Sequence, residues 1–116
     1  MYLQIKKKWF DMIASGEKKE EYREIKPYYD TRFQNMFGFI LLERKGKIEI
    51  LRGVLPEIER EPVQEIIFRN GYSTKAPMIK AKCSIRIGTG KEKWGAEKGK
   101  IYYILEIQSV EEIRNE

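Results

Sequence analysis

Apolar and polar residues alternate without interruption along Ile79-Lys80-Ala81-Lys82-Cys83-Ser84-Ile85-Arg86-Ile87. Because successive side chains of a β-strand point to opposite faces, this pattern predicts a strand over residues 78–87 with one apolar and one basic face. The same period of two recurs over residues 101–107, where the predicted core face carries Ile101, Tyr103, Leu105 and Ile107. Two such strands indicate that a β-sheet carries the hydrophobic core.

Shorter elements are predicted around these two strands. Further strands are expected at residues 2–5, from residue 20 onward, at 37–43 and at 48–53, with turns at 45–47, 69–72 and 88–90. A helix is predicted over residues 7–15, since Phe10 and Trp9 stand three and four residues before Ile13. Pro27 begins a turn or short helix over residues 27–33. Residues 63–67 predict a short helix that runs up to Phe68, and residues 110–114 predict a terminal turn.

The order of these elements predicts the fold class. Strands and helices do not alternate as βαβ units, so we expect an α+β fold whose mostly antiparallel sheet closes into a small β-barrel with one or two flanking helices. The chain has 116 residues, of which 41% are hydrophobic and 35% charged, and a single domain over residues 1–116 is expected. Cys83 is the only cysteine, which excludes an internal disulfide, and its place on the apolar face predicts a core residue.

Histidine is absent from the sequence. This absence excludes the Ser-His-Asp and Cys-His arrangements and every zinc site that needs an imidazole ligand. No cofactor and no metal site are predicted. Since no apolar run approaches the roughly 18 residues that cross a bilayer, we expect no contact with a membrane and a cytoplasmic location.

Positive charge is in excess and is clustered. The formal net charge is +5 and the isoelectric point is about 9.3, which favours a polyanionic partner such as RNA or a nucleotide-like ligand. Lys80, Lys82 and Arg86 share the polar face of the predicted strand over residues 78–87, and Trp94 lies among lysines in residues 91–100. A tryptophan in a basic loop either packs on the sheet or stacks on a base. The alternative is that these lysines only keep a small protein in solution.

A charged stretch follows the predicted helix: Gly16-Glu17-Lys18-Lys19-Glu20-Glu21-Tyr22-Arg23. Gly16 ends the helix, because glycine adopts the left-handed cap conformation at little cost. In a strand that begins near residue 20, Glu21 and Arg23 point to the same face, and Lys18 in the turn leans over that face. We interpret this as a functional cluster. The alternatives are a solvated run of charges, or an ion network that only holds the helix to the sheet.

The pattern G-x-K-x-x-E-x-R, formed by Gly16, Lys18, Glu21 and Arg23, resembles the ASCH domain family, and the resemblance extends over most of the chain. It implies a PUA-like β-barrel in which this segment lines a cleft beside the first helix. It also implies two activities, since some ASCH-type proteins are amidohydrolases that remove an acyl group from a modified cytidine, and others are credited with ribonuclease activity. The amidohydrolase-type members carry a threonine three residues after the lysine, where this chain has Glu21.

Three hypotheses for the function remain open. In the first, the protein binds RNA or another nucleic acid in a cationic cleft, with the candidate residues Lys18, Arg23, Arg32, Tyr29, Tyr72, Lys80, Lys82, Arg86 and Trp94. In the second, it is a hydrolase for a modified nucleoside or RNA, in which Glu21 activates water and Lys18 or Arg23 stabilises the developing charge. In the third, it is a regulatory adapter that binds a protein through exposed tyrosines, namely Tyr28, Tyr29, Tyr72 and Tyr102.

Overall fold

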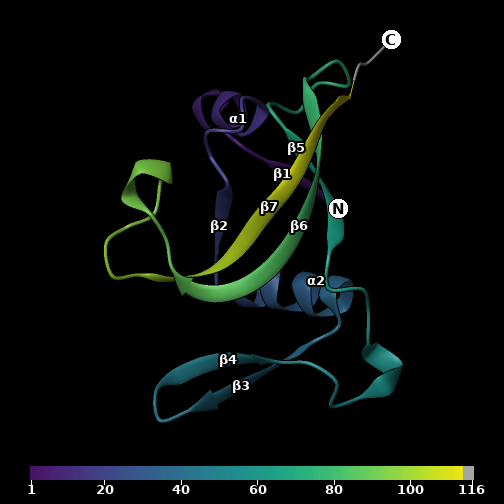
Figure 1. Ribbon diagram of the computed structural model, residues 1–116, viewed down its shortest axis with the longest axis vertical. Coiled ribbons are helices and arrows are strands. Elements are labelled where there is room, and N and C mark those ends of the chain that lie inside the picture. The colour runs from purple at the N-terminus through teal and green to yellow at the C-terminus, as the bar shows by residue number, and fades with distance from the viewer. Residues whose placement is uncertain (114–116) are drawn as a thin grey trace.

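The computed structural model describes residues 1–113 and is built around one curled five-stranded sheet (Figure 1). The strand order is β1-β5-β6-β7-β2. β1 runs parallel to β5, and every other neighbouring pair in this sheet is antiparallel. The strands are β1 (Tyr2–Gln4), β2 (Glu20–Glu24), β5 (Gln64–Arg69), β6 (Met78–Thr89) and β7 (Ile101–Ile113).

The sheet curls into a half-barrel because its two longest strands, β6 and β7, bend together (Figure 1). Their register shifts between Lys82 and Cys83, and a bulge of this kind increases the local twist. The curl brings the two edges of the sheet within reach of one side chain. Arg23 in β2 donates a hydrogen bond of 3.0 Å to the backbone carbonyl of Gln4 in β1. The fold is therefore a small α+β fold with a barrel-like sheet, as the sequence predicts.

Two helices flank the sheet, α1 (Lys7–Ala14) and α2 (Pro27–Phe37). α1 buries Phe10 and Ile13 against the sheet, and the chain then turns back so that the backbone N–H of Lys18 donates to the carbonyl of Met12 over 2.9 Å. α2 begins at a proline in its first turn and buries Phe33 and Phe37. The two helices thus close the apolar side of the curled sheet.

The core lies inside the curl. It contains Tyr103, near the start of β7, whose ring contacts Phe33 edge to face with ring centroids 5.2 Å apart. The Tyr103 hydroxyl donates a hydrogen bond of 2.6 Å to Asp30 in α2, so its polar end is satisfied. Cys83 is fully buried in the same core, as its place in the alternating pattern predicts.

A two-stranded hairpin of β3 (Ile40–Arg44) and β4 (Lys47–Leu51) extends beyond α2 (Figure 1). Two single-turn 3-10 helices complete the described residues, η1 (Pro56–Ile58) and η2 (Glu92–Trp94). Among residues 1–113, no helix has the length and apolar character needed to span a lipid bilayer.

Four sequence predictions of secondary structure are corrected here. The turn predicted at 88–90 begins later, because Gly88 and Thr89 still pair with β7 as the end of β6. The helix that begins at Pro27 continues to Phe37, so the strand predicted from residue 37 begins only at Ile40. The short helix predicted to run up to Phe68 is wrong, because this segment is β5, with Ile66 and Phe68 buried at a spacing of two. The terminal turn is also wrong as far as Ile113, because β7 pairs with β6 up to that residue, and Arg114 lies outside the described residues.

Candidate functional site

A pocket of about 280 Å³ opens between the two edge strands of the half-barrel. We call it the edge pocket. β1 and the residues that follow it form one side, β2 forms the opposite side, and α1, β7 and the loop around η2 complete the wall. It is lined by Gln4, Ile5, Lys6, Trp9, Glu21, Tyr22, Arg23, Trp94, Gly95 and Tyr102. The pocket therefore combines aromatic rings with a carboxylate and a guanidinium.

The Lys18 side chain is fully buried behind this pocket, with none of its surface exposed. Its ammonium group lies 3.3 Å from Oε1 of Glu21 and donates a hydrogen bond to the backbone carbonyl of Trp94. The rings of Trp9 and Tyr22 lie on two further sides, at 4.7 and 5.1 Å from Nζ to the ring centroids. Burial lowers the pKa of Lys18, although the neighbouring carboxylate of Glu21 acts in the opposite direction. Lys18 is not among the described residues that line the edge pocket.

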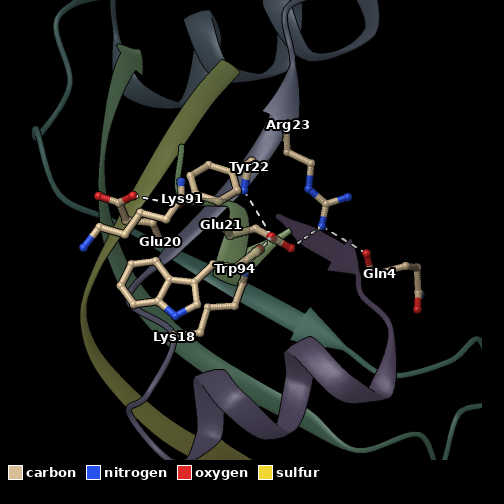
Figure 2. Close-up of polar contacts among 8 residues, drawn as sticks. All are labelled: Gln4, Lys18, Glu20, Glu21, Tyr22, Arg23, Lys91 and Trp94. Atoms are coloured by element: carbon tan, nitrogen blue, oxygen red, sulfur yellow. Dashed lines mark hydrogen bonds and ion pairs between the residues drawn. The ribbon is translucent and has the colours of Figure 1, made fainter. Parts of the chain in front are cut away.

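Glu21 connects two cations, as Figure 2 shows. Its Oε1 faces Lys18 and also accepts a hydrogen bond of 3.1 Å from the backbone N–H of Tyr22. Its Oε2 accepts a hydrogen bond of 3.0 Å from Nη2 of Arg23. The predicted alternation along this strand therefore brings Glu21 and Arg23 together, and the turn brings Lys18 to the same carboxylate.

The Arg23 guanidinium also spans the gap between the sheet edges. In addition to its bond to the Gln4 carbonyl, Nη1 donates to the hydroxyl of Tyr29 over 3.4 Å. The planar guanidinium has five N–H donors, so it can hold several acceptors in fixed directions at once. Arg23 thus both lines the edge pocket and holds its shape.

The loop around η2 closes the pocket from the side of β7. A Cβ on Gly95 would lie 3.0 Å from the ring of Trp9, and the backbone there has φ of +101°, which favours glycine. The Tyr22 hydroxyl accepts a hydrogen bond of 2.9 Å from the backbone N–H of Lys91 and donates one of 2.7 Å to Glu20. Burial is the main reason that the pKa of Tyr22 is raised. The loop is therefore tied to the pocket through Tyr22 and Trp9.

Four exposed lysines surround the aromatic wall, and we call them the rim lysines. Lys6 lines the edge pocket itself. The ammonium group of Lys8 lies 4.6 Å from the ring centroid of Trp9, and those of Lys91 and Lys93 lie 4.7 and 4.8 Å from that of Trp94. The pocket therefore has positive charge around its opening, although Lys18 supplies none of it.

The basic face of β6 lies apart from the edge pocket, and its Arg86 is ion-paired. Arg86 forms ion pairs of 3.0 Å with both Glu20 and Glu106. In the sheet register Lys80 faces Glu111, and Lys82 faces Glu65. None of these three basic residues is among the described residues that line the pocket.

The remaining predicted residues are distributed around the molecule. Arg32 lies on α2, where its guanidinium stacks on the ring of Tyr28 at 3.6 Å and donates to the Tyr28 carbonyl. Trp94 is buried, so its ring packs against the protein. Tyr72 is exposed in the loop between β5 and β6, next to the pocket. The prediction that Tyr102 is exposed is wrong, because the residues around η2 cover it.

Sequence reasoning did not find several residues of the pocket wall. Trp9 was predicted only as part of a buried helix face, and Gln4 and Gly95 carried no signal. The burial of Tyr102 follows from the period of two. Its side chain points to the face of β7 opposite to that of Tyr103, where it packs in a second small cluster with Ala96 and Ile104. The sequence did not indicate that both faces of the sheet are buried near the start of β7.

Comparison with known proteins gives no match: no family model fits the sequence, and no curated protein or solved structure is significantly similar to it. The fold and the site define a small α+β protein whose half-barrel has an aromatic-walled pocket at its open edge.

Proposed function

We propose that this protein binds RNA or another nucleic acid and receives one base in the edge pocket. The observation that carries the proposal is the pair of Glu21 and Arg23 in an aromatic wall. A base has two flat faces and a polar edge with donors and acceptors, and proteins that read single-stranded RNA bind both features. The carboxylate offers an acceptor and the guanidinium offers donors side by side, while the rings of Trp9 and Tyr22 offer apolar contact.

The charges around the opening suit the rest of a nucleotide. The four rim lysines carry exposed ammonium groups on two separate elements, α1 with its preceding residue and the loop around η2. Phosphate groups bind such cations with release of counterions, so the affinity of a nucleic acid should fall as the salt concentration rises. The resemblance to ASCH domains supports the same proposal, since it implies a cleft beside this segment in a PUA-like barrel.

A second candidate is hydrolysis of a modified nucleoside or RNA with Lys18 and Glu21 in the site. The lowered pKa of Lys18 and its contact with Glu21 favour it, because perturbed ionisable groups cluster at catalytic sites. Binding without catalysis fits the geometry better. The ammonium of Lys18 is enclosed by Trp9, Tyr22, Glu21 and the Trp94 carbonyl, and this leaves it no open path to a substrate.

The proposal is tested by titrating the protein with a labelled single-stranded RNA of about ten nucleotides, which lies within the common site sizes for such proteins. Fluorescence anisotropy gives the affinity at several salt concentrations. The two tryptophans of the chain both line the edge pocket, so quenching of their intrinsic fluorescence reports on occupancy of that pocket. Analysis of the RNA after incubation shows whether it is cleaved.

The matched variants are Lys6→Ala/Lys93→Ala at the rim and Lys45→Ala/Lys47→Ala at the β3–β4 hairpin, which remove the same charge. If both rim lysines contact phosphate, the first pair should reduce the slope of log affinity against log salt by about 1.4, and the second pair should leave it unchanged. No binding at low salt, or equal losses in the two pairs, would contradict the proposal. Cleavage of the RNA would favour the second candidate.

A further inference from the structure

A second hollow, of about 350 Å³, adjoins the edge pocket. Its walls are Gln4, Ile5 and Lys6, together with Asn70, Gly71 and Tyr72 from the loop between β5 and β6. The first three residues also line the edge pocket, so they form a wall that the two spaces share. Three consecutive residues span at most about 11 Å even when fully extended. The two spaces are therefore close enough for adjoining bases of one strand.

Tyr72 presents its ring at the second hollow with 86% of the residue exposed, the highest value among the exposed large hydrophobic residues of the part that the structure describes. The loop that carries it is tied down on both sides. Nη2 of Arg69 donates a hydrogen bond of 2.6 Å to the carbonyl of Ser73, and the backbone N–H of Asn70 donates to the carbonyl of Pro77 over 3.1 Å. An exposed ring on a positioned loop is suited to stacking on a base.

The shared wall has polar groups that suit a nucleotide. Oε1 of Gln4 is buried and has no hydrogen-bond partner among residues 1–113. Figure 2 shows that the Gln4 side chain points away from Glu21 and Arg23, so its amide is not part of their network. An unpaired buried acceptor costs free energy, and rotation of the amide into the hollow would let an N–H of a bound base recover it. The exposed ammonium of Lys6 lies on the same wall, where it can contact a phosphate.

We infer that the ligand is a single-stranded nucleic acid of at least two nucleotides. One base occupies the edge pocket, the neighbouring base stacks on Tyr72, and the phosphate that links them lies at Lys6. This inference rests on the proposed function and specifies its ligand. A base-paired duplex does not fit this arrangement, because its bases are stacked inside the helix and cannot separate into two hollows.

Calorimetric titration tests the inference with defined probes, the four ribonucleoside 5′-monophosphates and the four 5′-phosphorylated homodinucleotides. The native protein should bind its preferred dinucleotide roughly 5- to 100-fold more tightly than the monophosphate, since one stacked base contributes that much. Tyr72→Ala should lose this gain and leave the affinity for the monophosphate unchanged. Tyr72→Phe should keep the gain, because its ring stacks equally well.

The matched control is Tyr28→Ala, which removes another exposed tyrosine, on α2, outside the described walls of both hollows. It should bind both probes as the native protein does. If the monophosphate binds but the dinucleotide binds no more tightly, or if Tyr72→Ala behaves as the native protein, the inference is wrong and the proposed function stands. If an RNA duplex competes as well as the single strand, the inference is also wrong. If no probe binds and the longer RNA does not bind, both fail.

Discussion

The ammonium of Lys18 and the carboxylate of Glu21 form an ion pair with almost no contact to solvent. Removing two charges from water is costly, and their attraction repays that cost only where hydrogen bonds satisfy both groups. Here the Trp94 carbonyl, the Tyr22 backbone N–H and the Arg23 guanidinium supply those bonds. We interpret Lys18 as the residue that positions Glu21 and the loop around η2, while Glu21 and Arg23 line the edge pocket.

Replacement of Lys18 by methionine should therefore destabilise the protein. Lys18→Met keeps most of the volume but leaves the Trp94 carbonyl without its donor and removes one of the two cations that Glu21 contacts. The free energy of unfolding should therefore fall by about 3 kcal/mol. Urea denaturation followed by circular dichroism measures this loss. The control is Lys19→Met at the exposed neighbouring position, which should change stability by less than about 0.5 kcal/mol. Equal effects of the two changes would show that the buried pair contributes nothing.

At the scale of elements, side-chain and loop contacts join elements that are not connected by backbone hydrogen bonds between strands. β1 and β2 are the two edges of the five-stranded sheet, and the bond from Arg23 to Gln4 joins them. At the C-terminal end of α2, the backbone of Gly38 packs closely against that of residues 58–60. Both contacts place elements that are distant in the sequence.

Arg23→Lys tests the link between the edges. Lysine keeps the charge beside Glu21, but its single ammonium cannot hold Gln4, Glu21 and Tyr29 in the same plane. We expect a loss of about 1–2 kcal/mol in stability, in line with the hydrogen bonds to a charged group that are removed. Hydrogen exchange should accelerate most at the backbone N–H groups of Ile5 and Ile67, which join β1 to β5. Uniform acceleration across β6 and β7 would instead indicate a global loss of stability.

Gly38→Ala tests the contact at the end of α2. Gly38 has φ of +70°, and an added Cβ would overlap the backbone carbonyl oxygen of Ile58. The left-handed conformation alone costs roughly 1–2 kcal/mol for alanine, and the clash adds to it. The matched control is Gly46→Ala in the β3–β4 turn, where φ is +77° and no atom of the described residues lies within 4 Å of the added Cβ. Thermal unfolding should show a clearly larger loss of stability for Gly38→Ala than for Gly46→Ala. Equal losses would show that residues 58–60 move aside without a loss of stability.

At the scale of the whole molecule, ionisable groups in the core determine how stability depends on pH. Burial raises the pKa of the Cys83 thiol from 9.0 to about 12. Burial and a hydrogen bond to Asp30 raise the pKa of Tyr103 above its usual value of 10.0. A raised folded-state pKa gives stabilisation that is complete below the unfolded value and is lost as the pH rises toward the folded value. The protein should therefore lose stability in alkaline solution, first through Cys83 above pH 9.

Cys83→Ala isolates the contribution of the thiol. Since one pKa unit corresponds to about 1.36 kcal/mol, the native protein should lose about 1 kcal/mol relative to this variant between pH 9 and pH 10. The lowered pKa of Lys18 acts in the opposite direction, but it is common to both proteins and cancels in the difference. Urea denaturation of both proteins at a series of pH values measures this difference in the free energy of unfolding. If the difference in the free energy of unfolding between the two proteins stays constant over this range, the thiol has the same pKa in the folded and unfolded states.

Much of the fold was accessible from local pattern. The period of two places β6 and the start of β7, and the spacing of Phe10 and Ile13 gives α1. The pattern failed at β5, because Val63, Ile66 and Ile67 fit a helical spacing as well as a strand. Pairing with β1 and β6 decides between the two structures there. Local preference is weak compared with such long-range pairing.

The candidate site divides in the same way. That Glu21 and Arg23 share a face, and that Lys18 precedes them in a turn, could be predicted from the sequence, because these relations depend only on strand geometry over a short range. Tertiary contacts were needed to show that Lys18 is buried behind the pocket, that Trp9 and the loop around η2 form its walls, and that Arg86 on β6 is ion-paired. These features depend on the curl of the sheet, which brings together segments separated by more than 60 residues, and no local pattern records which segments will meet.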